Sequence, residues 1–567
     1  MSASPAEAAS AHAFREPPKG TRAGRRQVAR RRRLALAAVV LAAVTSGTML
    51  QNWSDNQSSH YDLVRALDAG RTTIGRGPYP TKDKAFYRGH WYSARAPGLA
   101  MYSLPFYELL TAVDAPAAAR ASHALRGEDE MIDFVGLWGT VLPALVLLLL
   151  VWRVAERFEP GYGAATAVLL GLGTMLLPFS TLLFSHVFAA MLGFGAFAIA
   201  VRERDGPPRL APLALAGLMM GYAISSEYPL AFAAIVVGLY VLSHPRARRP
   251  TLLAARAGAY VAGGVVGVVP LLLYNHAAFH SWTHLAYSNI PQQQRGFFGI
   301  SAPSLPVLAT LLFDSRGLLT LCPVLAMGAA GTVLLYRRGW RAEALAIAGV
   351  CACYLLYNSG YYLPFGGGSM GPRFLITIVP FLGFPIALAL RRAPALTLAL
   401  AGASIAVAVV ATITHPLVGY ETETVVWGRL LGQGFFQPTI ASAFGLGRGW
   451  GAIWPFLLAA AASLALAARA TPGLAASAKG LRMALLGLAT WALFAALAPT
   501  LLGIDHRGLE SILGAGDRMA LHKGFGSYPL RALALLGAGA GVLALAATQL
   551  SRPRRRARAT RGLRLSA

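Results

Sequence analysis

Residues that could carry chemistry are concentrated in one short stretch, Asp83–Gly98, of a chain that is otherwise largely apolar. The stretch begins with an acid, contains the bases Lys84, Arg88 and Arg95, and interleaves them with His90 and with aromatic residues. A carboxylate can take a proton from a hydroxyl as a general base. A guanidinium holds phosphate well because its donors match the phosphate oxygens in a fork. Together these groups suit the transfer of a group from a phosphate to a hydroxyl.

Further candidates for such a reaction lie in other predicted loops. We expect Asp83 to act as the catalytic base, with Asp55 as the competing choice. We expect Arg95 and Arg373 to bind the donor phosphate, because a charge at the membrane edge tends to have a partner. Side chains that could bind the substrate are those of His60, His90, Tyr92, His186 and Glu227.

Each candidate also has an ordinary structural explanation. Loop aspartates are often turn or cap residues, and arginines at an interface can act as anchors. His186 and Glu227 fall at the tips of predicted helical hairpins, where either could be a helix cap. Pairs such as Trp91-Tyr92 and Tyr361-Tyr362 occur in ordinary aromatic belts. Residue type alone leaves both explanations open.

The composition indicates a membrane protein. Of 567 residues, 55% are hydrophobic and 13% are charged, against about 25% charged residues in soluble domains. The net charge of +27 would suit a nucleic-acid partner, but the Lys and Arg residues stand in short clusters at the ends of apolar segments and in the two tails. Such clusters orient spans with their positive ends in the cytoplasm and contact anionic lipid. We therefore expect membrane lipids, and no nucleic acid, as partners.

The apolar segments predict an all-α, polytopic bundle of about fourteen transmembrane spans with both termini in the cytoplasm. Every loop that this count assigns to the cytoplasm is short and basic, whereas the long loops rich in aromatics, Gly and Pro fall on the other side. The expected spans are 34–50, 132–153, 163–183, 187–202, 210–226, 228–243, 254–275, 316–336, 341–357, 373–390, 394–413, 451–468, 482–500 and 529–549.

These spans divide the chain into four parts. We expect a disordered basic cytoplasmic arm at 1–33, a transmembrane module at 34–390 that includes an extracytoplasmic loop at 51–130, C-terminal transmembrane helices at 391–550 and a basic cytoplasmic tail at 551–567.

Two segments of the first long loop predict helices that lie in the membrane interface. Leu99–Leu110 is apolar but shorter than the roughly 20 residues that a bilayer core of about 30 Å requires. Its Tyr102 and Tyr107 suit the headgroup region. Ser58–Ala69 carries apolar residues at helical spacing on one face.

The sequence contains no pattern typical of a metal or cofactor site. Cys322, Cys351 and Cys353 fall in or beside apolar spans, and Cys-Ala-Cys is not a zinc or redox spacing. We interpret them as small buried hydrophobic residues. The glycine-rich segment Gly366–Gly371 is not a Walker sequence, and the acids are too scattered to propose a metal site. We expect neither a metal nor a cofactor.

A set of motifs resembles the GT-C superfamily of membrane glycosyltransferases, in particular poorly characterised bacterial relatives of the protein O-mannosyltransferases and lipid A aminoarabinose transferases. In those relatives an acid precedes Gly-His-Tyr-Tyr-Ser-Lys-Ala-Pro-Gly, and here Asp83 precedes Gly89-His-Trp-Tyr-Ser-Ala-Arg-Ala-Pro-Gly98. Further matches, within residues 35–390, are Gly171-Leu-Gly-Thr174, Phe184-Ser-His186, Glu227-Tyr-Pro229, Tyr274-Asn275, Arg316-Gly-Leu318 with Pro323, and Gly366-Gly-Gly-Ser-Met-Gly-Pro-Arg373.

Two positions depart from the pattern of this superfamily. Better-known members carry an acid about four residues before an aromatic of the first interfacial helix. Counting back from Tyr61 gives Gln57, and Asp55 lies two residues away, so the base assignment stays open between Asp55 and Asp83. Members often carry Lys where this chain has Arg95, which keeps the positive charge.

The resemblance implies a polyprenyl-phosphate sugar donor, transfer with inversion and no nucleotide at the site. We therefore expect a glycosyltransferase of the bacterial inner membrane. It would move the sugar to a hydroxyl of a lipid, glycan or protein acceptor on the extracytoplasmic face, by a metal-independent general-base mechanism. The alternatives are a transporter or flippase of lipid-linked saccharides, which usually shows internal repeats, and a non-catalytic membrane protein of envelope assembly.

Overall fold

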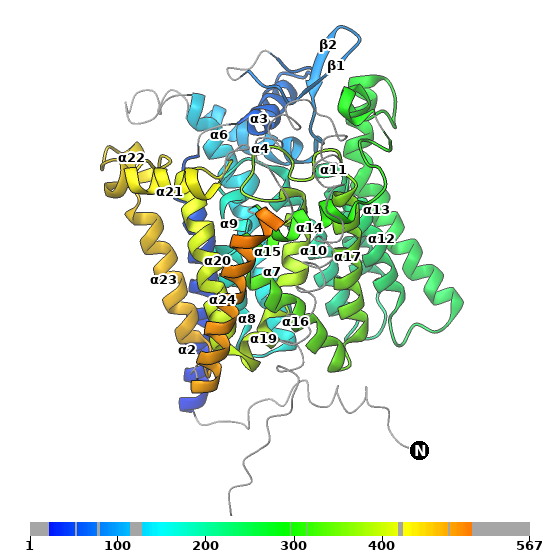
Figure 1. Ribbon diagram of the computed structural model, residues 1–567. Helices are drawn as coiled ribbons and strands as arrows, with labels where there is room; N and C mark the ends of the chain where they lie inside the picture. Colours follow the sequence, from blue (N-terminus) through cyan, green and yellow to red (C-terminus); the bar gives the residue numbers. More distant parts are fainter. Residues whose placement is uncertain are drawn as a thin grey trace, which may run out of the picture.

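The computed structural model describes residues 22–51, 54–75, 80–113, 128–294, 296–314, 316–417, 423–474 and 477–501. Within these residues the chain is mostly α-helical, in agreement with the predicted fold class, and its one sheet has two strands. The long helices lie beside one another as a bundle, and several short elements gather at one end of it (Figure 1).

The bundle is built from helices that follow the apolar segments of the sequence. They are α2 (Arg22–Gly47), α7 (Leu142–Phe158), α8 (Gly163–Leu172), α10 (Ser185–Glu203), α11 (Leu210–Ser226), α12 (Leu230–Leu242), α13 (Pro250–Phe279), α16 (Val324–Arg337), α17 (Arg341–Ser359), α19 (Ile386–Arg392), α20 (Pro394–Thr414), α23 (Trp454–Ala470) and α24 (Ala478–Leu501).

Shorter elements connect or extend these helices. They are α6 (Glu128–Gly136), η1 (Leu137–Val141), α9 (Leu176–Phe179), η2 (Ala286–Asn289), η3 (Pro291–Gln293), α14 (Leu305–Phe313), α15 (Leu318–Leu321), η4 (Arg373–Ile378), α18 (Val379–Gly383), α21 (Glu423–Gln433), α22 (Ile440–Ala443) and η5 (Gly449–Gly451).

Several helical segments are long and apolar enough to cross a membrane, so the chain is a multi-pass membrane protein. The described residues contain six such segments, or up to eight if each of two bent helix pairs is one span. The predicted count of about fourteen is not confirmed. Four further apolar helices have 10–17 residues, and the predicted span 529–549 lies outside the described residues.

Some predicted spans are interrupted in the structure. The segment 163–183 forms two helices, because α8 ends at Leu172 and α9 begins only at Leu176. The segment 373–390 bends by 54° between Gly383 and Ile386. Pro385 caps the second helix there, and proline lacks the N–H that would continue the preceding helix.

The basic arm differs from its prediction. Helix α2 begins at Arg22, so residues 22–33, which we expected to be disordered, are helical. This part is rich in Arg, which favours helix, and contains no proline. The rest of the arm and the whole C-terminal tail at 551–567 lie outside the described residues.

The short elements at one end of the bundle form what we call the cap layer. It consists of α3 (Asp55–Asp68), α4 (Gly98–Ala112) and the antiparallel strands β1 (Lys84–Tyr87) and β2 (His90–Ser93) (Figure 1). The two helices match the segments that we predicted to lie in the interface. The hairpin between them was not predicted.

The hairpin follows from the residues at its turn. Arg88 and Gly89 connect the strands with φ angles of 46° and 83°. Two consecutive positive φ angles are typical of the two-residue turn whose twist matches the strands on either side, and glycine adopts them without strain. The turn fixes the register, which pairs Lys84 with Ser93.

Helices α11 and α13 cross with their backbones almost in contact. A Cβ atom added at Gly217 would lie 1.9 Å from the carbonyl oxygen of Tyr260, and one added at Gly263 would lie 1.9 Å from that of Ala214. Small residues permit such close approach between helices in a membrane. Because Glu227 directly follows α11, this crossing also sets the position of its side chain.

Acidic residues at the C-terminal ends of α7 and α10 are paired with arginines. The Glu203 carboxylate accepts hydrogen bonds from both terminal nitrogens of Arg256 at 2.6 and 2.8 Å, and both side chains are about 1% exposed. Glu159 binds Arg338 at 2.5 Å and also Arg391. These acids and bases compensate each other within the protein.

The α11–α13 crossing generates a stability prediction. Gly263→Ala should destabilise the protein by about 1–3 kcal/mol, because the new methyl group must push the two backbones apart. Gly258→Ala is the matched control in the same helix, where an added Cβ meets nothing within 4 Å. We expect it to be neutral or slightly stabilising, by at most about 1 kcal/mol. Thermal unfolding in detergent compares the two, and equal melting temperatures would contradict the proposed packing.

Candidate active site

A cavity of about 450 Å³ lies between the cap layer and the adjoining ends of the bundle helices. Four of the residues that we predicted for the site line it, namely Asp55, Asp83, Arg95 and Arg373. They come from segments far apart in the chain. The other lining residues are Ser54, Asn56, Lys82, Lys84, Ala94, Phe184, Ile290, Gln292, Gln293, Tyr361, Tyr362, Leu363, Gly366, Gly367, Gly368, Phe374 and Leu417.

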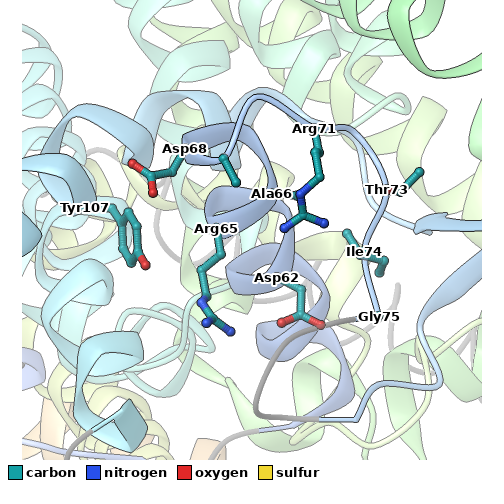
Figure 2. Close-up of a pocket in the computed structure, with 10 residues that line it drawn as sticks. Asp62, Arg65, Ala66, Asp68, Arg71, Thr73, Ile74, Gly75 and Tyr107 are labelled. Carbon is teal, nitrogen blue, oxygen red and sulfur yellow. The ribbon is translucent and has the colours of Figure 1, made fainter.

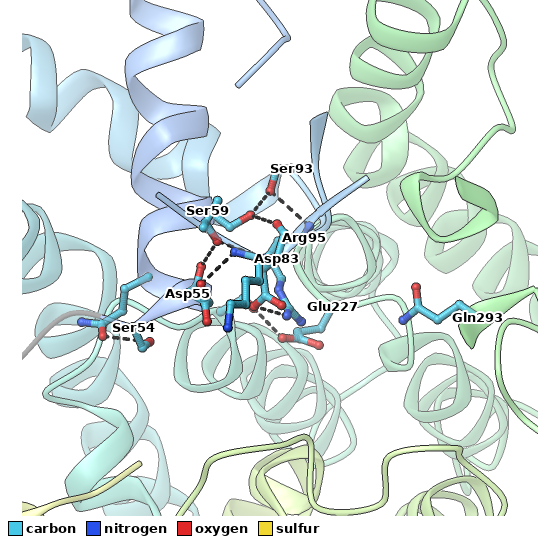
Figure 3. A network of polar contacts seen from close by, with 12 residues as sticks. Ser54, Asp55, Ser59, Asp83, Ser93, Arg95, Glu227 and Gln293 are labelled. Carbon is cyan, nitrogen blue, oxygen red and sulfur yellow. Dashed lines mark hydrogen bonds and ion pairs between the residues drawn. The ribbon is translucent and has the colours of Figure 1, made fainter. Parts of the chain in front are cut away.

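The hairpin brings Asp83 and Arg95 together although they are twelve positions apart. Beyond the pair Lys84–Ser93, the Ala94 N–H donates to the Asp83 carbonyl at 3.1 Å. The side chains of Asp83 and Arg95 then lie next to each other and form an ion pair (Figure 3). An acid and a base that flank a tight hairpin are therefore held at its open end.

Serine side chains join this ion pair to helix α3. The Ser59 hydroxyl donates to the Asp83 carbonyl at 2.6 Å and lies 2.8 Å from the Ser93 hydroxyl. The Arg95 N–H in turn donates to the Ser93 hydroxyl at 3.1 Å (Figure 3). The position of the ion pair is thus coupled to the position of α3.

Asp55 occupies the first turn of α3 and reaches the same cavity. One oxygen of its carboxylate accepts the Lys82 N–H at 2.8 Å, and its carbonyl accepts the Thr81 hydroxyl at 2.6 Å. Asp55 is exposed, and its carboxylate has no ion-pair partner among the described residues. Asp55 is therefore oriented by the backbone but not neutralised by a cation.

Arg95 governs the charge state of Asp83. Burial alone would raise the pKa of Asp83, but the Arg95 guanidinium, with Arg373 behind it, holds that pKa below its usual value. The same attraction outweighs burial at Arg95 and raises its pKa. Asp83 is accordingly a carboxylate of low basicity.

Arg373 is a buried cation with no acidic partner among the described residues. Its side chain is 6% exposed, and its Nε has no hydrogen-bond partner there. The guanidinium lies over the rings of Phe184 and Phe374, at 5.3 and 5.7 Å from their centroids. Aromatic faces attract a cation, but they do not replace the anion that a buried charge requires. An anion in the cavity would supply that compensation.

A glycine makes room for Arg373. Gly366 has a φ of +79°, and an added Cβ atom would lie 2.5 Å from the Arg373 Nε. Both the backbone conformation and the available space therefore exclude a larger residue at this position.

His186 and Glu227 form a buried pair that is not part of the cavity wall. The His186 Nδ1 lies 2.9 Å from a Glu227 oxygen, which also accepts the Ser185 hydroxyl. Burial would raise the pKa of Glu227, but His186, Ser185 and Arg95 lower it to about 2. Glu227 is therefore a carboxylate that keeps the proton on Nδ1, and the His186 Nε2 is left without a partner among the described residues.

His60 is fully buried on α3, on the side of the same charged groups. Burial, then Arg95, lower the pKa of His60 to about 3, although Glu227 opposes the shift. The ring is therefore neutral, and neither nitrogen has a hydrogen-bond partner among the described residues. It does not line the cavity.

None of the five residues that we predicted to bind the substrate lines the cavity. His60, His186 and Glu227 are buried near it, whereas His90 and Tyr92 belong to the hairpin. His90 is exposed in the hairpin next to its turn. Tyr92 is buried and packs on the ring of Phe279 at 4.9 Å, a packing contact and not part of the cavity wall. No residue of β2 lines the cavity, and the chain reaches the cavity wall only at Ala94 and Arg95, beyond the end of the strand.

Other lining residues were not predicted as site residues. Tyr361 and Tyr362 line the cavity, and the Tyr361 hydroxyl accepts a hydrogen bond from the Gln293 amide at 2.9 Å. We had considered the tyrosine pair only as part of an aromatic belt. The Gln-rich and aromatic composition of the predicted outer loops indicated that such residues could line a site, but it did not identify single residues.

A second, smaller polar cavity of about 190 Å³ lies beside α3, and no prediction included it. Asp62, Arg65 and Arg71 project into it, and Tyr107 of α4 lies at its edge (Figure 2). Burial raises the pKa of Asp62 to about 6, against the attraction of Arg65. It shares no lining residue with the larger cavity.

The described residues contain no group of three or more His, Cys, Asp or Glu side chains arranged to hold a metal ion. Cys322, Cys351 and Cys353 are free cysteines. The groups at the cavity are thus carboxylates, guanidiniums, amides and aromatic rings.

Comparison with known proteins gives distant similarities. No family model and no curated protein matches the chain. ArnT from Cupriavidus metallidurans bound to undecaprenyl phosphate is 15% identical over 82% of this chain and 78% of its own, with a TM-score of 0.45. The Archaeoglobus fulgidus oligosaccharyltransferase is 13% identical over 76% of this chain and 56% of its own, with a TM-score of 0.37. Both are members of the GT-C superfamily. At these scores, what this chain does has to follow from its own residues.

The buried, neutral His60 generates a prediction for the pH dependence of stability. Its pKa is about 3 in the folded protein and about 6.5 when exposed, so the unfolded chain binds the proton first as pH falls. His60 should therefore reduce the unfolding free energy below pH 6.5, by up to about 1.4 kcal/mol per pH unit. His60→Leu should remove this contribution.

The measurement is thermal or denaturant unfolding of both proteins in detergent between pH 7.5 and 4.5. The quantity of interest is the difference between variant and wild type, because other groups titrate in both. His90→Gln, at an exposed position, controls for the loss of a histidine as such. A difference that stays constant across this range would show that His60 does not titrate as described.

Proposed function

We propose that the chain is a membrane glycosyltransferase that moves a sugar from a polyprenyl-phosphate donor to a hydroxyl acceptor. The reaction would take place in the larger cavity, on the extracytoplasmic side of the bacterial inner membrane. The observation that carries this proposal is Arg373, a buried guanidinium that faces the cavity without an acidic partner among the described residues.

A phosphate is the ligand that this environment favours. Arg373 and Arg95 both line the cavity, and guanidinium groups bind phosphate with paired, charge-assisted hydrogen bonds. Lys82 and Lys84 add further positive charge to the wall. A multi-pass membrane protein with a cationic cavity at one end of its bundle suits a phosphate that is carried by a lipid.

The two carboxylates at the cavity differ in what they can do. Asp83 is paired with Arg95, which makes it a weak base. Asp55 is exposed to the cavity and has no ion-pair partner among the described residues. We therefore assign proton abstraction to Asp55, and to Asp83 the orientation of Arg95.

The reaction is then a single displacement with inversion. Asp55 accepts the proton of the acceptor hydroxyl, and the hydroxyl oxygen forms a bond to the anomeric carbon from the face opposite the phosphate. The bond between that carbon and the phosphate oxygen breaks, and polyprenyl phosphate leaves with the electron pair. Arg373 and Arg95 stabilise the charge on the leaving phosphate. His186, Glu227 and His60 do not line the cavity, so they would act on the charges of the arginines and not by direct contact with the substrate.

The donor site is tested by lipid binding. Arg373→Gln should weaken the binding of undecaprenyl phosphate to the purified protein at least tenfold, because it removes the uncompensated cation. Arg88→Gln, which changes an exposed hairpin residue outside the cavity, is the control and should bind like wild type. Equal affinity in all three proteins would remove the proposed phosphate site.

The base is tested by turnover. The release of polyprenyl phosphate from polyprenyl-phosphate hexoses is followed in the presence of envelope extract as the source of acceptors. Asp55→Asn should lower the rate about 10²–10⁴-fold, the usual contribution of a general base, and Asp83→Asn should lower it less. Asp68→Asn makes the same change on the exposed end of α3 and should have no effect. Wild type that binds the lipid but releases no polyprenyl phosphate would favour a transporter instead.

A further inference from the structure

We infer that the backbone of the glycine-rich loop Gly366–Gly368 forms part of the phosphate site, and that Arg316 holds it in the binding orientation. This rests on the proposed function, because the ligand is the phosphate of the polyprenyl donor. In this inference a backbone N–H of the loop binds the phosphate, and Arg316, which does not line the cavity, positions that N–H.

The loop presents unpaired backbone donors to the cavity. Gly366, Gly367 and Gly368 all line it. The Gly366 N–H donates to the Leu363 carbonyl at 2.9 Å. Among the described residues, the N–H groups of Gly367 and Gly368 have no such partner. Successive backbone N–H groups around a left-handed residue form concavities that bind anions, and Gly366 and Gly367 have φ angles of +79° and +90°.

Arg316 binds the carbonyl groups of the same loop from the side that does not face the cavity. Its guanidinium Nη2 donates to the carbonyl of Gly367 at 2.9 Å and to that of Ser369 at 2.5 Å. Its side chain is 4% exposed, lies over the Phe365 ring at 5.0 Å, and is not part of the cavity wall. The loop therefore stands between Arg316 and the cavity.

Because the peptide bond is planar, the hydrogen bond from Arg316 to the Gly367 carbonyl also fixes the direction of the next N–H group. In a planar trans peptide, the C=O of one residue and the N–H of the next point in opposite directions. The Gly367 carbonyl points to Arg316, so the Gly368 N–H points away from Arg316 and toward the cavity. If that carbonyl were released, the peptide could turn over and present an oxygen to an anion, which would repel it.

The Gly368 N–H and Arg373 then serve the same ligand. Gly366 touches the Arg373 side chain so closely that no Cβ would fit between them, which puts the loop and the guanidinium side by side on the wall. Arg373 is more than nine-tenths buried, and its Nε is without a partner among the described residues. A tetrahedral oxyanion at this point accepts from the guanidinium with one oxygen and from the Gly368 N–H with another.

Binding measurements with purified full-length protein in detergent test the inference. Arg316→Leu should weaken undecaprenyl phosphate binding about tenfold, although Arg316 does not touch the ligand. It should leave the binding of undecaprenol, which lacks the phosphate, unchanged. Arg316→Lys keeps a cationic donor for the carbonyls and should recover part of the loss. A general structural defect would weaken both lipids equally and would overturn the inference.

A backbone substitution provides a second test if Arg316→Leu fails to fold. Replacing residue 368 with lactic acid turns its amide into an ester and removes only the N–H, relative to Gly368→Ala. We expect about tenfold weaker undecaprenyl phosphate binding for the ester than for the alanine variant. Equal affinity of the two would show that the N–H does not contact the phosphate.

The arms of the experiment separate the possible sources of failure. Wild type that does not bind undecaprenyl phosphate would remove the proposed function itself, whereas normal binding in both the Arg316→Leu and ester variants would remove only the role of the loop. Inorganic phosphate is tested as a competitor. If it displaces the lipid at the concentration at which the lipid itself binds, the site belongs to the free ion and the assignment to a lipid headgroup is wrong.

Discussion

The arrangement of this molecule depends on one uncompensated charge, the guanidinium of Arg373. A cation that is more than nine-tenths buried is costly unless an anion is close. The described residues offer it aromatic faces, a neighbouring cation and the more distant carboxylates of Asp83 and Glu227, but no ion pair. The fold nevertheless builds a special environment for it, with Gly366 shaped to accommodate it. A protein that keeps such a charge at the wall of a cavity is organised to receive an anion there.

The opposite end of α10 shows what the same chain does when charge has a purely structural role. There Glu203 and Arg256 are both almost fully buried, and they satisfy each other through two hydrogen bonds. At the cavity end, by contrast, Asp83 pairs with Arg95 and Glu227 pairs with His186, whereas Arg373 has no ion-pair partner among the described residues. The contrast between the mutually paired Glu203 and Arg256 and the buried, unpaired guanidinium of Arg373 points to the cavity without reference to any relative.

The site also joins local and distant constraints. Asp83 and Arg95 meet because a two-residue turn at Arg88 and Gly89 sets the register of the hairpin. Arg373 meets them only because the cap layer sits over the end of the bundle. The serine contacts of Ser59 with the hairpin, and the close crossing that positions Glu227, hold these parts in place.

The sequence by itself determined the membrane character, the helical class and the two helices of the cap layer, because hydrophobicity and its spacing are local properties. It also singled out Asp55, Asp83, Arg95 and Arg373 as chemically notable. It could not count the spans, since prolines and glycines bend or shorten several apolar segments. The tertiary structure alone decided that Arg95 neutralises Asp83 and not Asp55, that His90 and Tyr92 lie outside the cavity, and that Arg316 grips the glycine loop. Each of these depends on which side chains face one another in the folded protein. The order of residues along the chain does not specify the distances between those side chains.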